Sequence, residues 1–328
     1  MKEKIWQGAD LIFDLDADHL KNAPKSYGGM LETVKKETEK LLAFLMSDFG
    51  FSESRLAAVF SGGRGYHIHV RDQRILSLGS DERREIVDYL AGRGLEMDRF
   101  IVMAPMEGDW GKDRAFRLRA PAAEAAGWGK RINRSIVSFV HSLRQQSEAD
   151  AIALLSKRKG IGPKRASSFY HSLQKENVLK EIASGNLDLF RGSAPIWKIL
   201  LEEFLDEEGV NVGFDLDSER GKTDEPVTAD VRRLIRCPGS LHGGSGLRVT
   251  PLSLADLEEF DPLHDALVFG DEHIPVQITK PFRTEMKGQA YNLAEGREEL
   301  PAHVAIFLMC RGVAEALSAR ERARNLAL

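Results

Sequence analysis

The stretch Ala9-Asp10-Leu11-Ile12-Phe13-Asp14-Leu15-Asp16-Ala17-Asp18 decides how the rest of the sequence is interpreted. Its apolar run predicts a largely buried strand over residues 11–15, because bulky apolar residues suit a pleated surface. Side chains alternate along a strand, so Asp14 and Asp16 share one face. Two neighbouring carboxylates at the end of a buried strand repel each other unless a cation lies between them. A divalent metal site is therefore predicted; a solvated acidic strand end is the alternative.

The composition limits the classes to which the protein can belong. The 328 residues carry 46 basic and 50 acidic side chains, a net charge of −4, so nucleic-acid binding would depend on local basic patches. Two cysteines, Cys237 and Cys310, exclude a disulfide framework and fit a reducing cytoplasm. No stretch reaches the roughly 20 apolar residues of a membrane span. We expect a cytoplasmic protein without membrane association.

Apolar periodicity predicts the remaining elements. The sequence predicts helices over residues 30–49, 81–93 and 301–328, and strands over residues 57–60 and 66–70. Residues 132–205 are helix-rich, with predicted breaks at Gly160, Gly185 and Pro195. We place the first part of a core at 1–130, a helical subdomain at 131–208, and the second part of the core at 209–328. The repeat of the acidic pattern at Phe214-Asp215-Leu216-Asp217 lies in a polar connection and is interpreted as incidental.

A glycine-rich segment, Ser61-Gly62-Gly63-Arg64-Gly65-Tyr66-His67, lies between the two predicted strands. Glycines allow close backbone approach, and successive exposed N–H groups form an anion nest. Arg64 suits a phosphate because its planar guanidinium donates two parallel hydrogen bonds. The segment predicts a triphosphate cradle; a tight hairpin with an exposed arginine is the alternative. His67 and His69 could instead be metal ligands, but no third soft ligand lies nearby in the sequence.

Two further basic segments stand out. The first runs from Asp224 to Gly246 and holds Arg236 and His242, with Pro238-Gly239 and Gly243-Gly244 on either side of the histidine. It predicts an irregular functional loop, with a basic surface helix and turn as the alternative. The second, Lys157-Arg158-Lys159-Gly160-Ile161-Gly162-Pro163-Lys164-Arg165, resembles half of a helix-hairpin-helix that contacts a DNA phosphate. A charged turn between two helices is the alternative there.

Three features follow one another along the chain: the D-x-D strand, the Ser-Gly-Gly-Arg-Gly-Tyr-His segment, and the segment from Asp224 to His242. In this order they resemble the catalytic small subunit of archaeal–eukaryotic DNA primases, in its archaeal form. The resemblance covers residues from about 4 to 257. It implies an α/β (α+β) fold, in which a mixed sheet flanked by helices carries the site, with an inserted helical subdomain. It also implies catalytic, metal-holding roles for Asp14, Asp16 and Asp224. The nucleotide-binding residues that it implies are Ser61, Arg64, His67, Arg236 and His242.

The resemblance implies a template-directed nucleotidyltransferase that makes short RNA or DNA primers on single-stranded DNA from NTPs or dNTPs. It implies two Mg²⁺ or Mn²⁺ ions and a heterodimer with a primase large subunit. Two departures from the family are expected to matter. Residues 18–49 contain one histidine, His19, and no cysteine, so no structural zinc is predicted. Family members usually carry several dozen more residues before the D-x-D, so we expect a misassigned start or a truncation.

Three other functions compete with this interpretation. Haloacid-dehalogenase phosphatases also begin with a hydrophobic D-x-D, but they require Thr or Val where this sequence has Asp18. Primase-like polymerases of bacterial end-joining repair share the D-x-D and Ser-Gly motifs, whereas the Pro-Gly-Ser-Leu-His-Gly segment at 238–243 favours a primase. The third alternative is that the chain, if truncated, acts only as a non-catalytic binding subunit. Phosphoenzyme formation would identify a phosphatase, de novo synthesis without a primer separates a primase from a repair polymerase, and metal-dependent nucleotide incorporation excludes a purely non-catalytic subunit.

Overall fold

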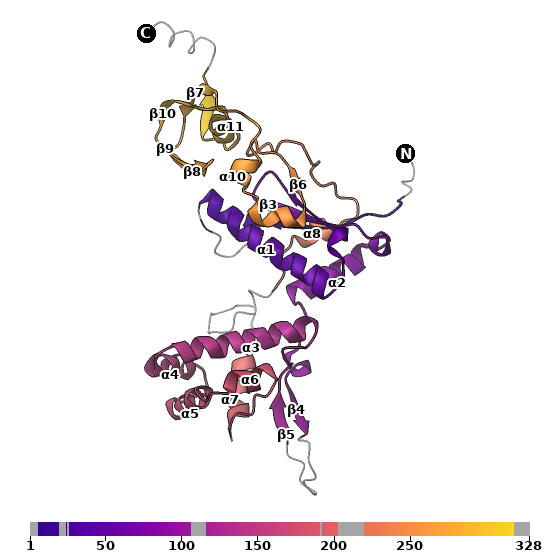
Figure 1. Ribbon diagram of the computed structural model, residues 1–328, viewed down its shortest axis with the longest axis vertical. Coiled ribbons are helices and arrows are strands. Elements are labelled where there is room, and N and C mark those ends of the chain that lie inside the picture. The colour runs from indigo at the N-terminus through magenta and orange to yellow at the C-terminus, as the bar shows by residue number, and fades with distance from the viewer. Residues whose placement is uncertain are drawn as a thin grey trace. The chain divides into compact units, whose positions relative to one another are not determined.

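The computed structural model describes residues 6–19, 24, 26–105, 116–190, 192–202 and 220–317 (Figure 1). The chain divides into two compact units, Met1–Ala91 with Gly221–Leu328, and Gly92–Arg220. The second unit begins earlier than the helical subdomain predicted at 131–208. The reason is that backbone hydrogen bonds join residues 118–123 to residues 183–187, which lie among the helices of that unit. The repeated acidic pattern at 214–217 lies outside the described residues.

A four-stranded sheet forms the centre of the first unit. Its strands are β1 (Leu11–Asp16), β2 (Leu56–Phe60), β3 (Gly65–Val70) and β6 (Thr250–Leu252), in the order β1-β3-β2-β6. The α+β class is confirmed. A mixed sheet was expected, but every pairing in this sheet is antiparallel. The three strands predicted from apolar runs are confirmed to within one residue at each end.

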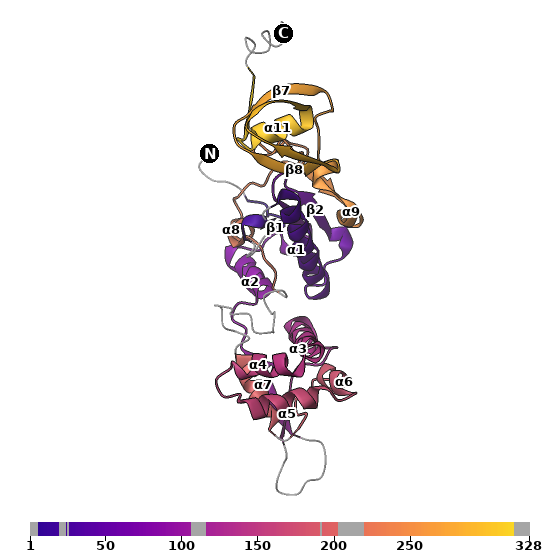
Figure 2. The ribbon, with the colours of Figure 1, turned by 90° about the vertical axis from the view of Figure 1, so that its left-hand side faces the viewer.

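One face of β1 is the core face. Leu11 and Phe13 are fully buried and Leu15 nearly so. The helix α1 (Tyr27–Ser47) contacts β1 and β3 (Figure 2), and its Val34, Leu41 and Leu45 are fully buried. Burying each such side chain contributes about 1.5–3 kcal/mol. The helix begins three residues before the predicted start, because Ser26 caps it and accepts a hydrogen bond from the Gly29 N–H. The opposite face of β1 is left to the aspartates.

The helix α2 (Ser80–Ala91) fixes the chain that enters β1. Arg83 is almost fully buried, and its guanidinium donates to the backbone oxygens of Ala9, Asp10 and Leu78. A cation buried in this way is tolerated because each donor group has an acceptor. The predicted helix over residues 81–93 is thus confirmed with slightly different bounds.

A smaller set of strands completes the first unit. A sheet of order β10-β7-β11 combines β10 (Gly296–Pro301), β7 (His273–Ile278) and β11 (Ala314–Ala316). A hairpin joins β8 (Phe282–Met286) to β9 (Gln289–Leu293). The other helices of this unit are α8 (Glu225–Ala229), α9 (Leu254–Glu259), α10 (Pro262–Asp265) and α11 (Ala302–Cys310).

The helix predicted over residues 301–328 is confirmed over residues 302–310 and wrong over residues 311–317. The helix α11 ends at Cys310, and Gly312 follows with a φ of 69°, a left-handed conformation that only glycine adopts at little cost. The chain then pairs with β7 as β11. Residues 318–328 lie outside the described part of the chain.

The second unit is a helical bundle with one hairpin. It contains β4 (Val102–Pro105), β5 (Phe116–Arg119), α3 (Gly127–Gln145), α4 (Glu148–Ser156), α5 (Pro163–Leu173), α6 (Val178–Ala183) and α7 (Ser193–Glu202). Gly160 and Gly185 separate helices as predicted, whereas Pro195 lies in the first turn of α7, where its missing N–H costs nothing. Across both units, no described helix combines the length and the apolar character that a bilayer crossing requires.

Candidate active site

Asp224 lies beside the D-x-D pair although more than 200 residues separate them in sequence. Its backbone N–H donates to the Asp14 carbonyl oxygen at 2.9 Å, and the Thr228 hydroxyl donates to the Ile12 oxygen at 2.8 Å. Residues 224–228 therefore run along the open edge of β1. The three aspartates predicted as catalytic come from two segments, which are joined by hydrogen bonds to the backbone oxygens of β1.

The register of β1 against β3 determines what faces the aspartates. Asp14 lies opposite His67, and Asp16 lies opposite Gly65. The His67 Nε2 is 3.5 Å from the Asp14 Oδ1. Since the Asp14 carbonyl points to the open edge of β1, this cross-strand pair is of the type that is not hydrogen-bonded, in which side chains lie closest. The predicted metal-site and nucleotide-site residues thus meet on one face.

The donor chemistry of this face fits a divalent cation. The Asp14 and Asp16 side chains are 23% and 29% exposed, so an ion can reach both carboxylates. Carboxylate oxygens are the ligands that Mg²⁺ and Mn²⁺ prefer. Within the described residues, no group of three or more acidic, His or Cys side chains already has the spacing of a metal cage. Arg64 occupies part of the site instead: its Nη2 lies 3.4 Å from the Asp16 Oδ1, and its guanidinium pairs bidentately with Asp18.

The loop between β2 and β3 packs tightly because of its glycines. A Cβ on Gly65 would lie 1.8 Å from the Leu15 carbonyl oxygen, and Gly62 has a φ of 75°. A Cβ on Gly63 would lie 2.9 Å from the His242 Nε2. Buried Ser61 accepts a hydrogen bond from the Gly63 N–H at 3.3 Å. The glycine-rich loop and the His242 loop are therefore in direct contact.

The His242 loop is irregular, as the glycines around it predicted. Residues 231–249 form no helix, so the alternative of a basic surface helix is wrong. The His242 N–H donates to the Leu247 oxygen at 2.9 Å, and the Ser245 hydroxyl donates to the Gly62 oxygen. The His242 Nδ1 accepts from the Gly244 N–H at 3.1 Å, so in the neutral ring the proton is on Nε2. The loop holds that N–H donor beside Gly63.

Both histidines are kept neutral by their surroundings. Burial, and after it His69 and Arg236, lowers the pKa of His67 to about 3. Burial and Arg236 also lower the pKa of His242, with smaller contributions from Arg64 and Arg311, while Asp16 opposes them. Arg236 thus acts electrostatically on both rings. Three arginines around two neutral imidazoles provide charge and donors for a polyanion.

Sequence reasoning missed two residues at this site. Tyr27 donates its hydroxyl to the Gly63 oxygen at 2.5 Å, and burial raises the pKa of Tyr27 to about 12, so it stays a donor. Arg311, just after α11, lies 5.3 Å above the Tyr27 ring. No local pattern marks either residue, because their positions depend on how α1 and α11 pack.

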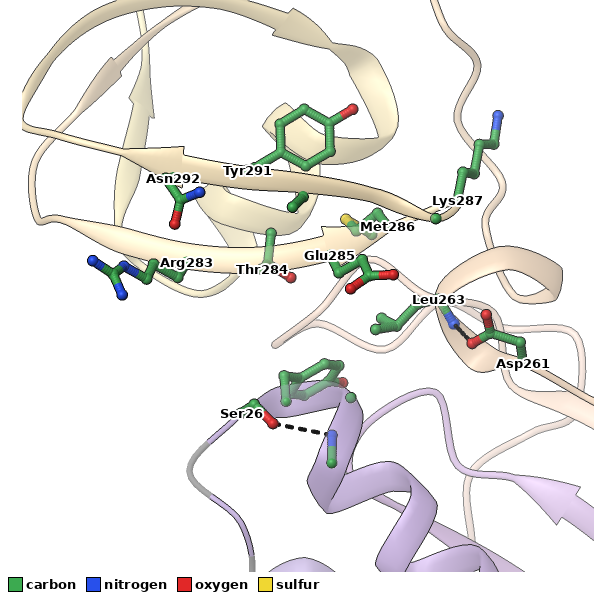
Figure 3. Close-up of a pocket in the computed structure, with 15 residues that line it drawn as sticks. Ser26, Asp261, Leu263, Arg283, Thr284, Glu285, Met286, Lys287, Tyr291 and Asn292 are labelled. Carbon is green, nitrogen blue, oxygen red and sulfur yellow. Dashed lines mark hydrogen bonds between the residues drawn. The ribbon is translucent and has the colours of Figure 1, made fainter.

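A cavity of about 490 Å³, lined by both polar and apolar side chains, adjoins Tyr27, which hydrogen-bonds to the glycine-rich loop (Figure 3). Side chains of the β8–β9 hairpin, among them Arg283, Glu285 and Asn292, lie across it from Ser26 at the start of α1. No sequence pattern predicted this cavity, because its two walls are 250 residues apart in the chain.

Comparison with known proteins supports one family. A model of the DNA primase small subunit family matches residues 13–254. A protein of Methanothrix thermoacetophila described as DNA primase small subunit PriS is 53% identical over 96% of this chain and 79% of its own length. Proteins with the same description from Methanococcoides burtonii and Haloarcula marismortui are 46% and 40% identical, each over 96% of this chain and 78% of their own lengths. The chain belongs to the DNA primase small subunit family, in its archaeal form.

Proposed function

We propose that this protein is the catalytic subunit of a DNA primase, which synthesises short RNA or DNA primers on a single-stranded DNA template. The observation that carries the proposal is the backbone hydrogen bond from Asp224 to Asp14, next to a glycine loop in contact with His242. It supports a site that holds carboxylates and polyphosphate donors side by side. Nucleotidyl transfer needs this combination, because a triphosphate must be charge-balanced and aligned with the attacking hydroxyl.

Asp14, Asp16 and Asp224 would hold two Mg²⁺ or Mn²⁺ ions. Such ions, when bound, make the 3′-hydroxyl more acidic and neutralise the triphosphate and the leaving pyrophosphate. Asp16 accepts a hydrogen bond from the Asp18 N–H and lies beside the Arg64 guanidinium, which would turn to the nucleotide when Asp16 takes a cation. Arg64 would therefore exchange carboxylates for phosphate oxygens, a bidentate contact of the same geometry.

The nucleotide-binding residues would each donate to the triphosphate. Ser61, Arg64 and Arg236 would supply hydroxyl and guanidinium donors, and His67 and His242 would supply N–H groups. Because both imidazoles are neutral, an arriving polyanion gains these hydrogen bonds without displacing a bound counter-ion. We also propose the partners that the family implies: a primase large subunit, a single-stranded DNA template, and NTPs or dNTPs. No structural zinc is proposed.

The test is primer synthesis by Asp224→Asn and Asp14→Asn, each assayed with Mg²⁺ and with Mn²⁺. We expect a loss of at least about 100-fold, because removing even an outer-shell partner of a metal ligand costs about 10- to 100-fold. Asp230→Asn is the matched control, since Asp230 is exposed and its carboxylate caps only the Arg232 N–H. Near-normal synthesis by the folded Asp224→Asn variant, with an unchanged metal requirement, contradicts the proposal.

A further inference from the structure

The hairpin between α4 and α5 is the one basic segment that the proposed active site does not use. The two helices pack against each other, and residues 157–162 connect them. The sequence left open whether this segment contacts DNA or is a charged turn. The structure allows the question to be argued from burial, charge and access.

The turn is a fixed structure. Leu155 and Ile161 are buried on either side of it, and Gly160 has a φ of 99° with Ile199 packed behind it. Buried Arg158 donates back to the Leu154 oxygen at 3.1 Å, and Arg165 reaches the Gly160 oxygen at 3.4 Å. The turn therefore presents its exposed groups in a set arrangement, which lowers the entropy cost of binding a ligand.

Four exposed cations surround the turn: Lys157, Lys159, Lys164 and Arg165. Segment 157–165 contains no acidic residue, in a chain whose net charge is −4. None of the four forms an ion pair with a carboxylate in the described part of the chain. A concentrated, uncompensated positive charge on one surface favours a polyanionic partner.

The surface is hollowed where the cations gather. Residues 160–165 line this hollow, which includes the beginning of α5. Gly162, the N-cap of α5, provides no side-chain cap, and a Cβ placed on it would meet nothing within 4 Å. Pro163, the first residue of α5, has no N–H, and the Ala166 N–H is bonded to the Gly162 oxygen. The backbone donors left open to a ligand at the turn are therefore those of Lys164 and Arg165, and the helix dipole favours an anion there.

We propose that the α4–α5 hairpin binds the phosphodiester backbone of nucleic acid, independently of base sequence, through its turn backbone and its flanking cations. Phosphate oxygens satisfy both kinds of donor, since lysine and arginine pair with their charge and backbone N–H groups donate to them. The choice of nucleic acid over other polyanions rests on the proposed function. The hairpin is a second contact, in a different unit from the carboxylates, and it would hold the template or the growing duplex during synthesis.

The test compares the full chain with its Lys164→Glu/Arg165→Glu variant, using a labelled single-stranded DNA and the matching duplex without nucleotide or metal. We expect at least tenfold weaker binding, and a shallower dependence of log K on log salt between about 50 and about 200 mM. The slope should fall by about 1.8 if the contact is to duplex and by about 1.4 if it is to a single strand. Lys175→Glu/Lys180→Glu is the control, with the same charge change on exposed lysines of the same unit.

Gly162→Ala tests the turn itself without changing charge. Its backbone φ of −78° suits alanine and the added methyl is unobstructed in the free protein, so folding should be unaffected. The methyl would block close approach to the turn, and we expect several-fold weaker binding to whichever DNA the hairpin contacts. Binding by the charge-reversed variant equal to that of its control, or unchanged binding by Gly162→Ala, overturns the proposal. Asp224→Asn should bind both DNAs normally, so failure of the proposed catalysis and failure of this contact are distinguishable.

Discussion

His69 is a buried titratable residue outside the proposed site. It lies opposite Ile12 on the neighbouring strand, and its Nε2 has no hydrogen-bond partner among the described residues. Burial foremost, then Arg71, lowers its pKa. The folded protein therefore resists protonating His69, whereas the unfolded chain protonates it below about pH 6.5. Its contribution to stability is present above that pH and is lost as the pH falls, because the unfolded state then binds the additional proton.

His69→Leu should make stability less sensitive to acid. Between about pH 7.5 and about pH 5.5, the free energy of unfolding should fall less in the variant than in the parent, by on the order of 1 kcal/mol. Urea unfolding at the two pH values measures this difference. His141→Leu, at an exposed histidine, serves as the control and should leave the pH dependence unchanged. Equal acid sensitivity in His69→Leu and the parent would show that His69 titrates alike in both states.

Arg311 is one of the two residues at the proposed site for which the sequence offers no signal. It stacks on Tyr27 and adds positive potential at His242. We expect Arg311→Gln to weaken nucleotide affinity about tenfold, which corresponds to about 1.4 kcal/mol. Equilibrium titration of the nucleotide measures the effect, and Lys280→Gln, at an exposed lysine of the same unit, should change affinity by less than twofold. A normal affinity in Arg311→Gln would remove this residue from the nucleotide site.

At the scale of elements, the loop between β2 and β3 makes two different uses of glycine. A methyl at Gly65 would collide with the Leu15 backbone, which cannot move without breaking the β1–β3 pairing. A methyl at Gly63 would first meet the ring of His242, which can turn away. We predict that Gly65→Ala destabilises the protein by more than about 3 kcal/mol. Gly63→Ala should fold well but bind nucleotide several-fold more weakly.

Thermal unfolding and nucleotide titration of the two variants distinguish these effects. Gly243→Ala is the control in the neighbouring loop, since a methyl there meets nothing within 4 Å. It should change stability by less than about 0.5 kcal/mol. The loop geometry described above would be wrong if Gly65→Ala were as stable as this control.

Elements with a strong local signal could be predicted from the sequence, but the segments that pack against them could not. The strand at 11–15 and the helix at 30–49 follow from apolar periodicity, which depends only on neighbours in sequence. Nothing near Asp224 indicates that residues 224–228 cover the open edge of β1, because that contact depends on the whole chain. The helix from 301 was extended past Cys310 because Ala314, Glu315, Ala316 and Leu317 are good helix formers, and Gly312 outweighs them.

At the scale of the whole molecule, the sequence predicted a helical insertion but not its extent. The strands β4 and β5 carry exposed apolar residues, among them Met103 and Phe116, and lack the alternation that identifies a half-buried strand. They join the helical unit through long-range hydrogen bonds such as that from the Leu187 N–H to the Leu118 oxygen. The boundary between units is a property of tertiary contacts, so local composition does not reveal it.

The two units carry separate cores, and the buried tryptophans among the described residues all belong to the second unit. Trp128 and Trp197 are buried in the second unit, whereas Trp6 of the first unit is 44% exposed. Blue-shifted fluorescence should therefore follow the unfolding of residues 92–220. The proposed nucleotide and metal site lies wholly in the first unit, so ligand binding stabilises that unit alone.

Calorimetry with and without nucleotide and Mg²⁺ should accordingly show two transitions, of which only one moves. At a ligand concentration of about 100 times Kd, the gain of about 2.7 kcal/mol should raise the transition of the first unit by about 5–10 °C. The transition that coincides with the fluorescence change should stay within about 1 °C, since no proposed contact with the nucleotide or Mg²⁺ involves the second unit. In Asp224→Asn, whose metal site is incomplete, the shift should largely disappear. A single transition that moves as a whole on adding ligand would mean that the units unfold together, because the free energy of binding would then stabilise both cores.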